Sequence, residues 1–239
     1  MNNRNLKSEF ESALQTLSYR HDIRNAFEGV IDAILYNLIA LDNAGFRKNP
    51  FERFKGEENT LVKCIEVLGE LMENGGDGLH DALGDLFMEY LSFGKNGQFF
   101  TPQPICDMMA IMSFTEEPRN GQTVCDPACG SGRLLLGAAK RNRELRFYGS
   151  DVDLLCVKMT VLNLALNNLR GEIVWGNPLS LEVYGSFIIE REIFTGFPII
   201  YTQKTSAMFG KLQETLKQEP AAQEPTKNKP QQLTLFSDE

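Results

Sequence analysis

The chain has 239 residues, of which 42% are hydrophobic, so it can bury one substantial core or two small ones. Its formal net charge of −8 excludes a protein that wraps nucleic acid by bulk electrostatics, because neutralising phosphates requires clustered Lys and Arg. No run approaches the roughly 18 apolar residues of a membrane span, and the polar start Met1-Asn2-Asn3-Arg4-Asn5 lacks the pattern of a secretion signal. We therefore expect a cytoplasmic protein with no membrane partner.

The cysteines indicate packing rather than chemistry. Five cysteines in apolar surroundings, an odd number, predict reduced thiols. Cys125 and Cys129 have a spacing found in metal sites, but no second Cys or His pair follows them, and His21 and His80 lie far upstream. The sequence therefore predicts no metal site.

The first part of the chain is predicted to be helical. Breaks at residues 43–56 and 74–78, rich in Gly and Asn, separate the helices from one another. We expect a helical N-terminal region over residues 1–94. Apolar residues recur at helical spacing in two runs, Ile23, Phe27, Val30, Ile31, Ile34, Leu35 and Leu38, then Leu61, Cys64, Ile65, Leu68, Leu71 and Met72.

Beyond residue 94 the pattern changes to short strands that alternate with helices near 133–143 and 153–168. This alternation is typical of a parallel sheet with crossover helices. We expect an α/β, Rossmann-like domain over residues 95–217, with a sheet of about three to five strands and a last helix over 206–217. The expected strands are 123–126, 146–150 and 172–175, with 186–193 and 199–201 as two further candidates.

The last residues form a separate predicted segment. From Glu219 the composition is dominated by Pro, Gln, Lys, Glu and Ala, which cannot bury a core. The sequence therefore predicts a disordered tail over residues 218–239.

A glycine loop, Asp126-Pro127-Ala128-Cys129-Gly130-Ser131-Gly132, lies between a predicted strand and a predicted helix. Its glycines let the backbone approach a ligand, and the helix N-terminus presents free N–H groups, so the loop suits a nucleotide-like cofactor. Three kinds of ligand are candidates for this loop. A phosphate-binding P-loop requires Gly-Lys-Ser/Thr, and a dinucleotide fingerprint requires another glycine after two residues; both are missing. The acidic residue that opens the loop suits a cofactor with an ammonium group.

A second carboxylate follows the next predicted strand. Asp151 lies twenty-five residues after Asp126, and a carboxylate in this place can accept both hydroxyls of a ribose, as an adenosyl cofactor requires. In the alternative interpretation, Asp151 or the neighbouring Asp153 caps the following helix. The two roles can coexist.

Two motifs carry a family resemblance. Gly97-Gln98-Phe99-Phe100-Thr101-Pro102, followed about twenty-five residues later by the glycine loop, resembles the methylation subunit of type I restriction-modification systems and related N6-adenine DNA methyltransferases. Residues 81–90, Asp-Ala-Leu-Gly-Asp-Leu-Phe-Met-Glu-Tyr, are similar to the helix that precedes the first motif in that family. The resemblance covers roughly residues 79–181 and implies a methyltransferase fold that binds S-adenosylmethionine.

The resemblance also implies roles for particular residues. Phe100, Thr101 and Pro102 would border the methionine end of the cofactor, Asp151 would hold the ribose, and Asn177 would accept a hydrogen bond from the adenine amine. Asn177 lies in Gly176-Asn177-Pro178-Leu179, where Pro178 departs from the small hydroxyl residue usual in the family. The loop residues implied as cofactor-binding are Asp126, Pro127, Gly130, Ser131 and Gly132.

The catalytic motif of the family is missing. Its members hold the target amine with Asn/Asp/Ser-Pro-Pro-Tyr/Phe after the fourth strand, where the aromatic ring stacks on the flipped base. The nearest segments here, Asn177-Pro178-Leu179 and Phe197-Pro198-Ile199, lack the second proline and the aromatic. We therefore expect a truncated family member without the catalytic half, and no catalytic residue can be assigned.

The tail contains a second motif, Gln232-Leu233-Thr234-Leu235-Phe236, which resembles the peptide that binds the bacterial sliding clamp. Leu235 and Phe236 supply buried apolar area and Gln232 an oriented amide, as recognition of a peptide in a groove requires. Leu233 is the fourth residue expected to bind the partner. The alternative is an accidental apolar patch on a polar tail. A flexible linker of about a dozen residues spans roughly 20 Å, enough to tether the folded part beside DNA.

Three functions remain open. The first is a SAM-dependent adenine-N6 DNA methyltransferase of reduced form, in which a second chain would supply the catalytic half. The second is a non-catalytic SAM-binding accessory module recruited to DNA through the sliding clamp. The third, methyl transfer to a small molecule, is disfavoured because residues 97–102 resemble DNA-modifying proteins.

Overall fold

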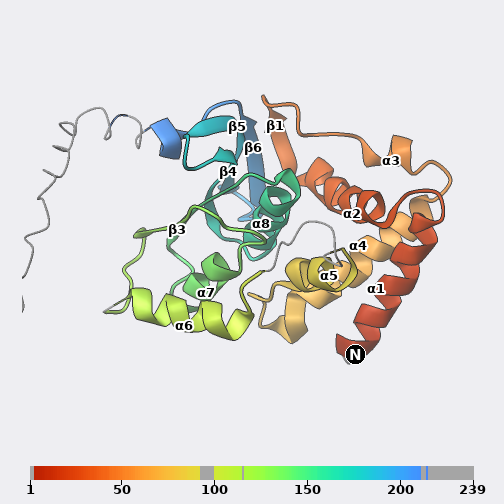
Figure 1. Cartoon of the computed structure of the whole chain (residues 1–239), viewed down its shortest axis with the longest axis horizontal. Coiled ribbons are helices and arrows are strands. Elements are labelled where there is room, and N and C mark those ends of the chain that lie inside the picture. The colour runs from red at the N-terminus through yellow and green to blue at the C-terminus, as the bar shows by residue number, and fades with distance from the viewer. Residues whose placement is uncertain (1–2, 92–99, 115, 211–213, 215–239) are drawn as a thin grey trace, which may run out of the picture.

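Helices form the N-terminal part of the protein, as predicted (Figure 1). The computed structural model describes residues 3–91, 100–114, 116–210 and 214. Helix α2 begins after Asp22, whose side chain accepts the N–H of Asn25 and so satisfies a free donor of the first turn. The helices are α1 (Asn3–Ser18), α2 (Ile23–Leu38), α3 (Pro50–Arg53), α4 (Glu58–Glu73), the 3-10 turn η1 (Asn74–Gly76) and α5 (Ala82–Tyr90).

A six-stranded mixed sheet forms the centre of the molecule, in the order β1-β6-β5-β4-β3-β2. Strands β2, β3 and β4 are parallel, β5 runs antiparallel to both β4 and β6, and β1 is parallel to β6. All five expected strands are present. The strands are β1 (Ile39–Asp42), β2 (Thr123–Asp126), β3 (Arg146–Asp151), β4 (Arg170–Asn177), β5 (Glu182–Arg191) and β6 (Pro198–Gln203).

The expected three to five strands were too few, because β1 comes from the N-terminal region that was expected to be helical throughout. Ile39 follows α2 directly and is fully buried, and it pairs with Ile200 of β6. Asp42 then ends the strand by accepting the N–H groups of Gly45 and Arg47. This strand exists through its pairing with residues about 160 positions later, which local spacing does not reveal.

Three helices flank the parallel strands: α6 (Gln103–Ser113), α7 (Arg133–Arg141) and α8 (Leu154–Leu166). Every residue from Leu155 to Ala165 is buried, as expected of a helix that is covered on all sides. Helix α8 packs on the sheet and also contacts α2 and α5, so one continuous core joins the N-terminal helices to the sheet (Figure 1). Within this contact Lys158 pairs with Asp32 at 2.5 Å.

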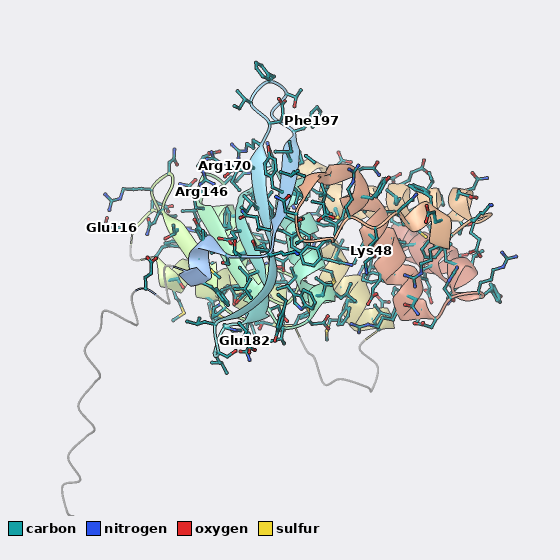
Figure 2. The ribbon with its side chains drawn as sticks, turned by 90° about the horizontal axis from the view of Figure 1, so that it is seen from above. Lys48, Glu116, Arg146, Arg170, Glu182 and Phe197 are labelled. Carbon is teal, nitrogen blue, oxygen red and sulfur yellow. The ribbon has the colours of Figure 1, made fainter. Side chains whose placement is uncertain are left out.

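The two ends of the sheet differ. Seen from above, Glu182 lies at one end, and the β5–β6 hairpin carries Phe197 away from the body at the other (Figure 2). The carboxyl ends of β2, β3 and β4 lie at the Glu182 end, since Asn177 pairs with Glu182. Among the described residues, no helix is both long and apolar enough to cross a membrane.

Candidate cofactor site

The glycine loop joins β2 to α7 at the carboxyl edge of the sheet, as predicted. Gly130 has φ +55° and Gly132 φ +90°, the left-handed region that favours glycine. A Cβ at Gly130 would lie 2.9 Å from the Phe100 ring, and one at Gly132 would lie 3.0 Å from Thr160. Both positions therefore require glycine for conformation and for space.

Neighbouring elements fix the backbone of the loop. The N–H of Cys129 donates to the carbonyl of Ser150 in β3 at 2.9 Å. From α8, Thr160 Oγ1 donates to the carbonyl of Gly130 and Asn163 Nδ2 to that of Ser131, each at 2.7 Å. These three hydrogen bonds fix the loop backbone against β3 and α8.

A hollow of about 100 Å³ opens beside the loop and contains residues from both predicted motifs. Phe100 forms one wall and stacks on Phe87 of α5, with 5.2 Å between the ring centroids. Pro102 lies outside this hollow and borders an adjacent depression. The lining residues are Phe100, Thr101, Cys106, Asp126, Ala128, Cys129, Gly130, Ser131, Arg133 and Leu134.

Two carboxylates meet at the loop. Asp151 Oδ2 accepts the N–H of Gly130 at 3.0 Å, and Asp126 Oδ1 accepts that of Ala128 at 3.1 Å. Burial raises the pKa of both carboxyls, and the negative charge of Asp151 raises that of Asp126 further. Neither carboxylate forms an ion pair with a described residue. A bound cation would therefore offset the negative charge of these two carboxylates, which no described residue neutralises.

The residue that caps the helix after β3 is Asp153. The sequence left open whether Asp151 or Asp153 has this capping role. Asp153 Oδ1 accepts the N–H of Leu155, the second residue of α8, at 2.9 Å. Asp151 instead turns to the glycine loop and accepts the N–H of Asp153 through its other oxygen. Asp151 thus has no capping role in α8, and its carboxylate faces the glycine loop.

Asn177 lies apart from the hollow, at the end of β4. Its Oδ1 accepts the N–H of Leu179 at 2.9 Å and so closes the turn that contains Pro178. The clamp-like peptide, with Gln232, Leu233, Leu235 and Phe236, lies outside the described residues.

A buried polar network behind the loop was not predicted. Asp81, 1% exposed, accepts hydrogen bonds from Ser131 Oγ, Arg133 Nε and Asn163 Nδ2. It also accepts the N–H of Gly84 and so caps α5. Asp81 thereby connects α5, the loop and α8. Ser131, an expected cofactor residue, directs its hydroxyl into this network, although it also lines the hollow.

The chain is an α/β protein whose glycine loop and two carboxylates lie at the carboxyl edge of its sheet. Residues 78–185 match the family model described as N-6 DNA Methylase, and this part of the chain belongs to that family. The chain is related to the methylase subunits of type I restriction enzymes.

Two relatives show the extent of the similarity. The MjaVIII type I restriction enzyme methylase subunit of Methanocaldococcus jannaschii is 24% identical over 186 residues, which cover 71% of this chain and 30% of the relative. The MpnII type I restriction enzyme methylase subunit of Mycoplasma pneumoniae is 31% identical over 151 residues, covering 59% and 27%. The chain thus spans less than a third of the length of either relative.

The chain also has a low similarity to a solved structure. The methyltransferase subunit of a type I restriction-modification system from Streptococcus thermophilus superposes with a TM-score of 0.36 and 21% identity, over 67% of this chain and 36% of that one.

Proposed function

We propose that the chain binds S-adenosylmethionine at the glycine loop and serves adenine-N6 methylation of DNA. The observation that carries the proposal is the pair Asp126 and Asp151, two partly buried carboxylates at one loop that lack a cationic partner among the described residues. S-adenosylmethionine bears an ammonium group and two ribose hydroxyls, which are the groups that such carboxylates bind. Family membership of residues 78–185 supports this choice over other adenosyl ligands.

Each residue at the site has a proposed role. Asp151 accepts the ribose hydroxyls, and Asp126 with the loop N–H groups binds the amino-acid end, which Phe100 and Thr101 border. Asn177 Oδ1 accepts the N–H groups of Leu179 at 2.9 Å and Ser180 at 3.4 Å, and it would accept the adenine amine in place of the longer bond. When bound, the cofactor supplies a methyl group on a positively charged sulfur. The protein's own residues orient it and shield it from water.

The hollow fits only part of this ligand. Its volume of about 100 Å³ is below the roughly 300–1,000 Å³ of typical small-molecule sites. It therefore suits one end of the cofactor, and the rest would extend past Gly130 towards Asp151, which are joined by a 3.0 Å hydrogen bond.

The acceptor side of the reaction is not assigned to residues of this sequence. The 239 residues contain no Asn/Asp/Ser-Pro-Pro-Tyr/Phe segment to hold a flipped adenine. We propose that transfer to DNA requires a further polypeptide that carries this loop, whether it belongs to a longer form of the chain or to a second chain. DNA is then the proposed substrate of the completed enzyme.

A second candidate function rests on the peptide Gln232-Leu233-Thr234-Leu235-Phe236. We propose as the alternative that the chain is a non-catalytic SAM-binding accessory protein, which the bacterial sliding clamp brings to DNA. The net charge of −8 favours such indirect recruitment over direct binding to phosphates.

The experiment that tests the proposal measures cofactor binding and methyl transfer together. The purified chain is incubated with S-adenosylmethionine labelled in the methyl group and with unmethylated DNA, and retained cofactor and labelled adenine are both quantified. Retention of the cofactor with labelled adenine supports the enzyme. Retention without transfer supports the accessory protein or one part of a divided enzyme, and no retention rejects both forms of the proposal.

A further inference from the structure

A depression of about 490 Å³ lies between the ends of α4 and α8, apart from the candidate cofactor site. Its volume is within the roughly 300–1,000 Å³ of small-molecule sites. Arg143 precedes β3 and Asn167 precedes β4, so the depression lies towards the amino edge of the sheet, whereas the glycine loop lies at the carboxyl edge. We call it the α4/α8 depression. Its lining residues are Gly69, Met72, Glu73, Gly76, Asp77, Gly78, Arg143, Leu166 and Asn167.

Hydrogen bonds hold one wall of the α4/α8 depression in place. Asn167, 6% exposed, accepts the N–H of Leu79 at 2.7 Å and donates to the carbonyl of Asn163 at 2.8 Å. Arg143 Nη2 donates to the carbonyl of Asn167 at 2.8 Å. This bond fixes the guanidinium of Arg143 against the end of α8, and a binding group that is already positioned lowers the entropic cost of binding.

Another wall contains a glycine that the fold does not require. Gly69 lies within α4, and glycine is unfavourable in the interior of a helix. Its backbone φ is not in the left-handed region, and apart from its own helix backbone no described heavy atom lies within 4 Å of its Cβ position. Neither packing nor backbone conformation therefore explains this glycine. It does keep the depression open, because a side chain here would extend into the open space.

Opposite charges line the depression without pairing. Glu73 and Asp77 contribute carboxylates and Arg143 a guanidinium. Within the described part of the chain, none of these three side chains forms an ion pair. Glu73 is also the last residue of α4, where the free carbonyls of the helix end add partial negative charge. The depression thus presents a negative side and a positive group that do not neutralise each other.

Apolar surface completes the lining. Leu166, the last residue of α8, is 43% exposed, although every residue from Leu155 to Ala165 is buried. Met72 of α4 also lines the depression and is buried. Leu166 therefore leaves apolar surface that a small aliphatic or aromatic group would remove from water.

We propose that the α4/α8 depression binds a zwitterion, an α-amino acid with an apolar side chain. Its carboxylate pairs with Arg143, whose planar guanidinium can donate two parallel hydrogen bonds. Its ammonium group lies at the end of α4 beside Glu73 and Asp77, and its side chain covers Leu166. A simple anion would meet the two carboxylates, and a simple cation would leave the guanidinium unpaired, so a ligand with both charges satisfies the lining best.

The first test is calorimetric titration of the full chain with L-leucine and with L-phenylalanine. The charged side chains of the depression are exposed, so we expect dissociation constants of about 0.1–1 mM that rise with salt concentration. N-acetyl-L-leucine lacks the ammonium charge and L-leucine amide lacks the carboxylate. Each derivative should therefore bind at least about tenfold more weakly than L-leucine.

The second test changes the protein. Gly69→Met should fill the depression, and it should preserve the fold because methionine favours a helix more than glycine does. Arg143→Gln should remove the partner of the carboxylate. Each variant should bind L-leucine at least about tenfold more weakly, with unchanged circular dichroism. Arg119→Gln is the matched control, since Arg119 is exposed outside the depression, and it should bind L-leucine as wild type does.

Three results would overturn the proposal. The first is no binding of either amino acid at concentrations up to about 10 mM, above the weakest expected dissociation constant. The second is equal affinity for L-leucine and its two derivatives. The third is wild-type affinity of Gly69→Met and Arg143→Gln for L-leucine, which would place its binding elsewhere, for example at the cofactor hollow. No step uses S-adenosylmethionine, so this proposal can fail while the proposed function stands.

Discussion

Arg133 donates from Nε to Asp81 Oδ2 at 2.5 Å, across fifty-two positions of the chain, and Asp81 is almost inaccessible to solvent. The same Arg133 donates to Asp85 of α5 through Nη2 at 2.6 Å. Arg133, which directly follows the glycine loop, is therefore held by a helix of the N-terminal region, so the shape of this loop depends on residues outside its own strand and helix.

Asp81→Ala should destabilise the protein and reduce cofactor binding at the same time. The substitution leaves Arg133, Ser131 and Asn163 without their shared acceptor, and breaking a buried ion pair typically costs about 3–5 kcal/mol. Urea unfolding measures the loss. Asp77→Ala is the control, because Asp77 is exposed in the same segment and should change stability by less than about 0.5 kcal/mol. Equal stability of the two variants would contradict the structural role of Asp81.

Gly130→Ala should abolish cofactor binding through two effects, a Cβ at positive φ and contact with the Phe100 ring. Gly121→Ala isolates the first effect, because Gly121 has φ +76° and nothing within 4 Å of its Cβ position. We expect Gly121→Ala to lose about 1–2 kcal/mol of stability and to keep its affinity for S-adenosylmethionine. Calorimetric titration of both variants checks this, and unchanged binding by Gly130→Ala would show that the loop can adjust.

Asp151→Ala should remove cofactor binding, whereas Asp153→Ala should leave it in place. Asp151 faces the glycine loop, and Asp153 caps α8, where loss of the cap costs about 1 kcal/mol. Equilibrium dialysis with labelled cofactor compares the two neighbouring variants. Wild-type affinity in Asp151→Ala would exclude the ribose role.

Asp126→Asn should make the protein more stable at neutral pH. Burial and Asp151 raise the pKa of Asp126 in the folded state, so the folded protein holds this proton more tightly than the unfolded chain. Protonated Asp126 therefore contributes to the stability of the folded protein below the unfolded-state pKa of about 3.9. This contribution is lost as the pH rises through the pKa of Asp126 in the folded state. In urea unfolding, the free energy of unfolding of the variant should exceed that of wild type at pH 7 by more than about 0.5 kcal/mol, and the difference should be smaller at pH 4. A constant difference would assign the effect to something other than this carboxyl.

Replacement of Leu235 and Phe236 by Ala should abolish binding to the bacterial sliding clamp without changing the unfolding curve. These two side chains supply most of the apolar area of the proposed peptide. Surface plasmon resonance with immobilised clamp compares the variant with wild type, and Thr234→Ala, which retains both apolar residues, is the control. Clamp affinity that is the same in all three proteins would reject the tether.

Local spacing predicted those features of the fold that depend on neighbouring residues. The glycine loop lies between its strand and helix as expected, because Gly130 and Gly132 have a conformational requirement that is visible in the sequence. The strand β1 was missed because Ile39–Asp42 becomes a strand only by pairing with β6. Asp81 was missed for a related reason, since a carboxylate before a helix is also the ordinary sign of a helix cap, and its contacts with Arg133 and Asn163 are long-range.

Helix α8 also bears on how such a chain can change during evolution. It is buried on every side between Leu155 and Ala165, and Lys158, which pairs with Asp32 of α2, is an ionisable group in that interior. A descendant that exchanged its N-terminal helices for another segment would inherit an uncovered apolar helix and an unpaired ammonium group. The N-terminal helices and the loop-bearing sheet are therefore constrained to be inherited together.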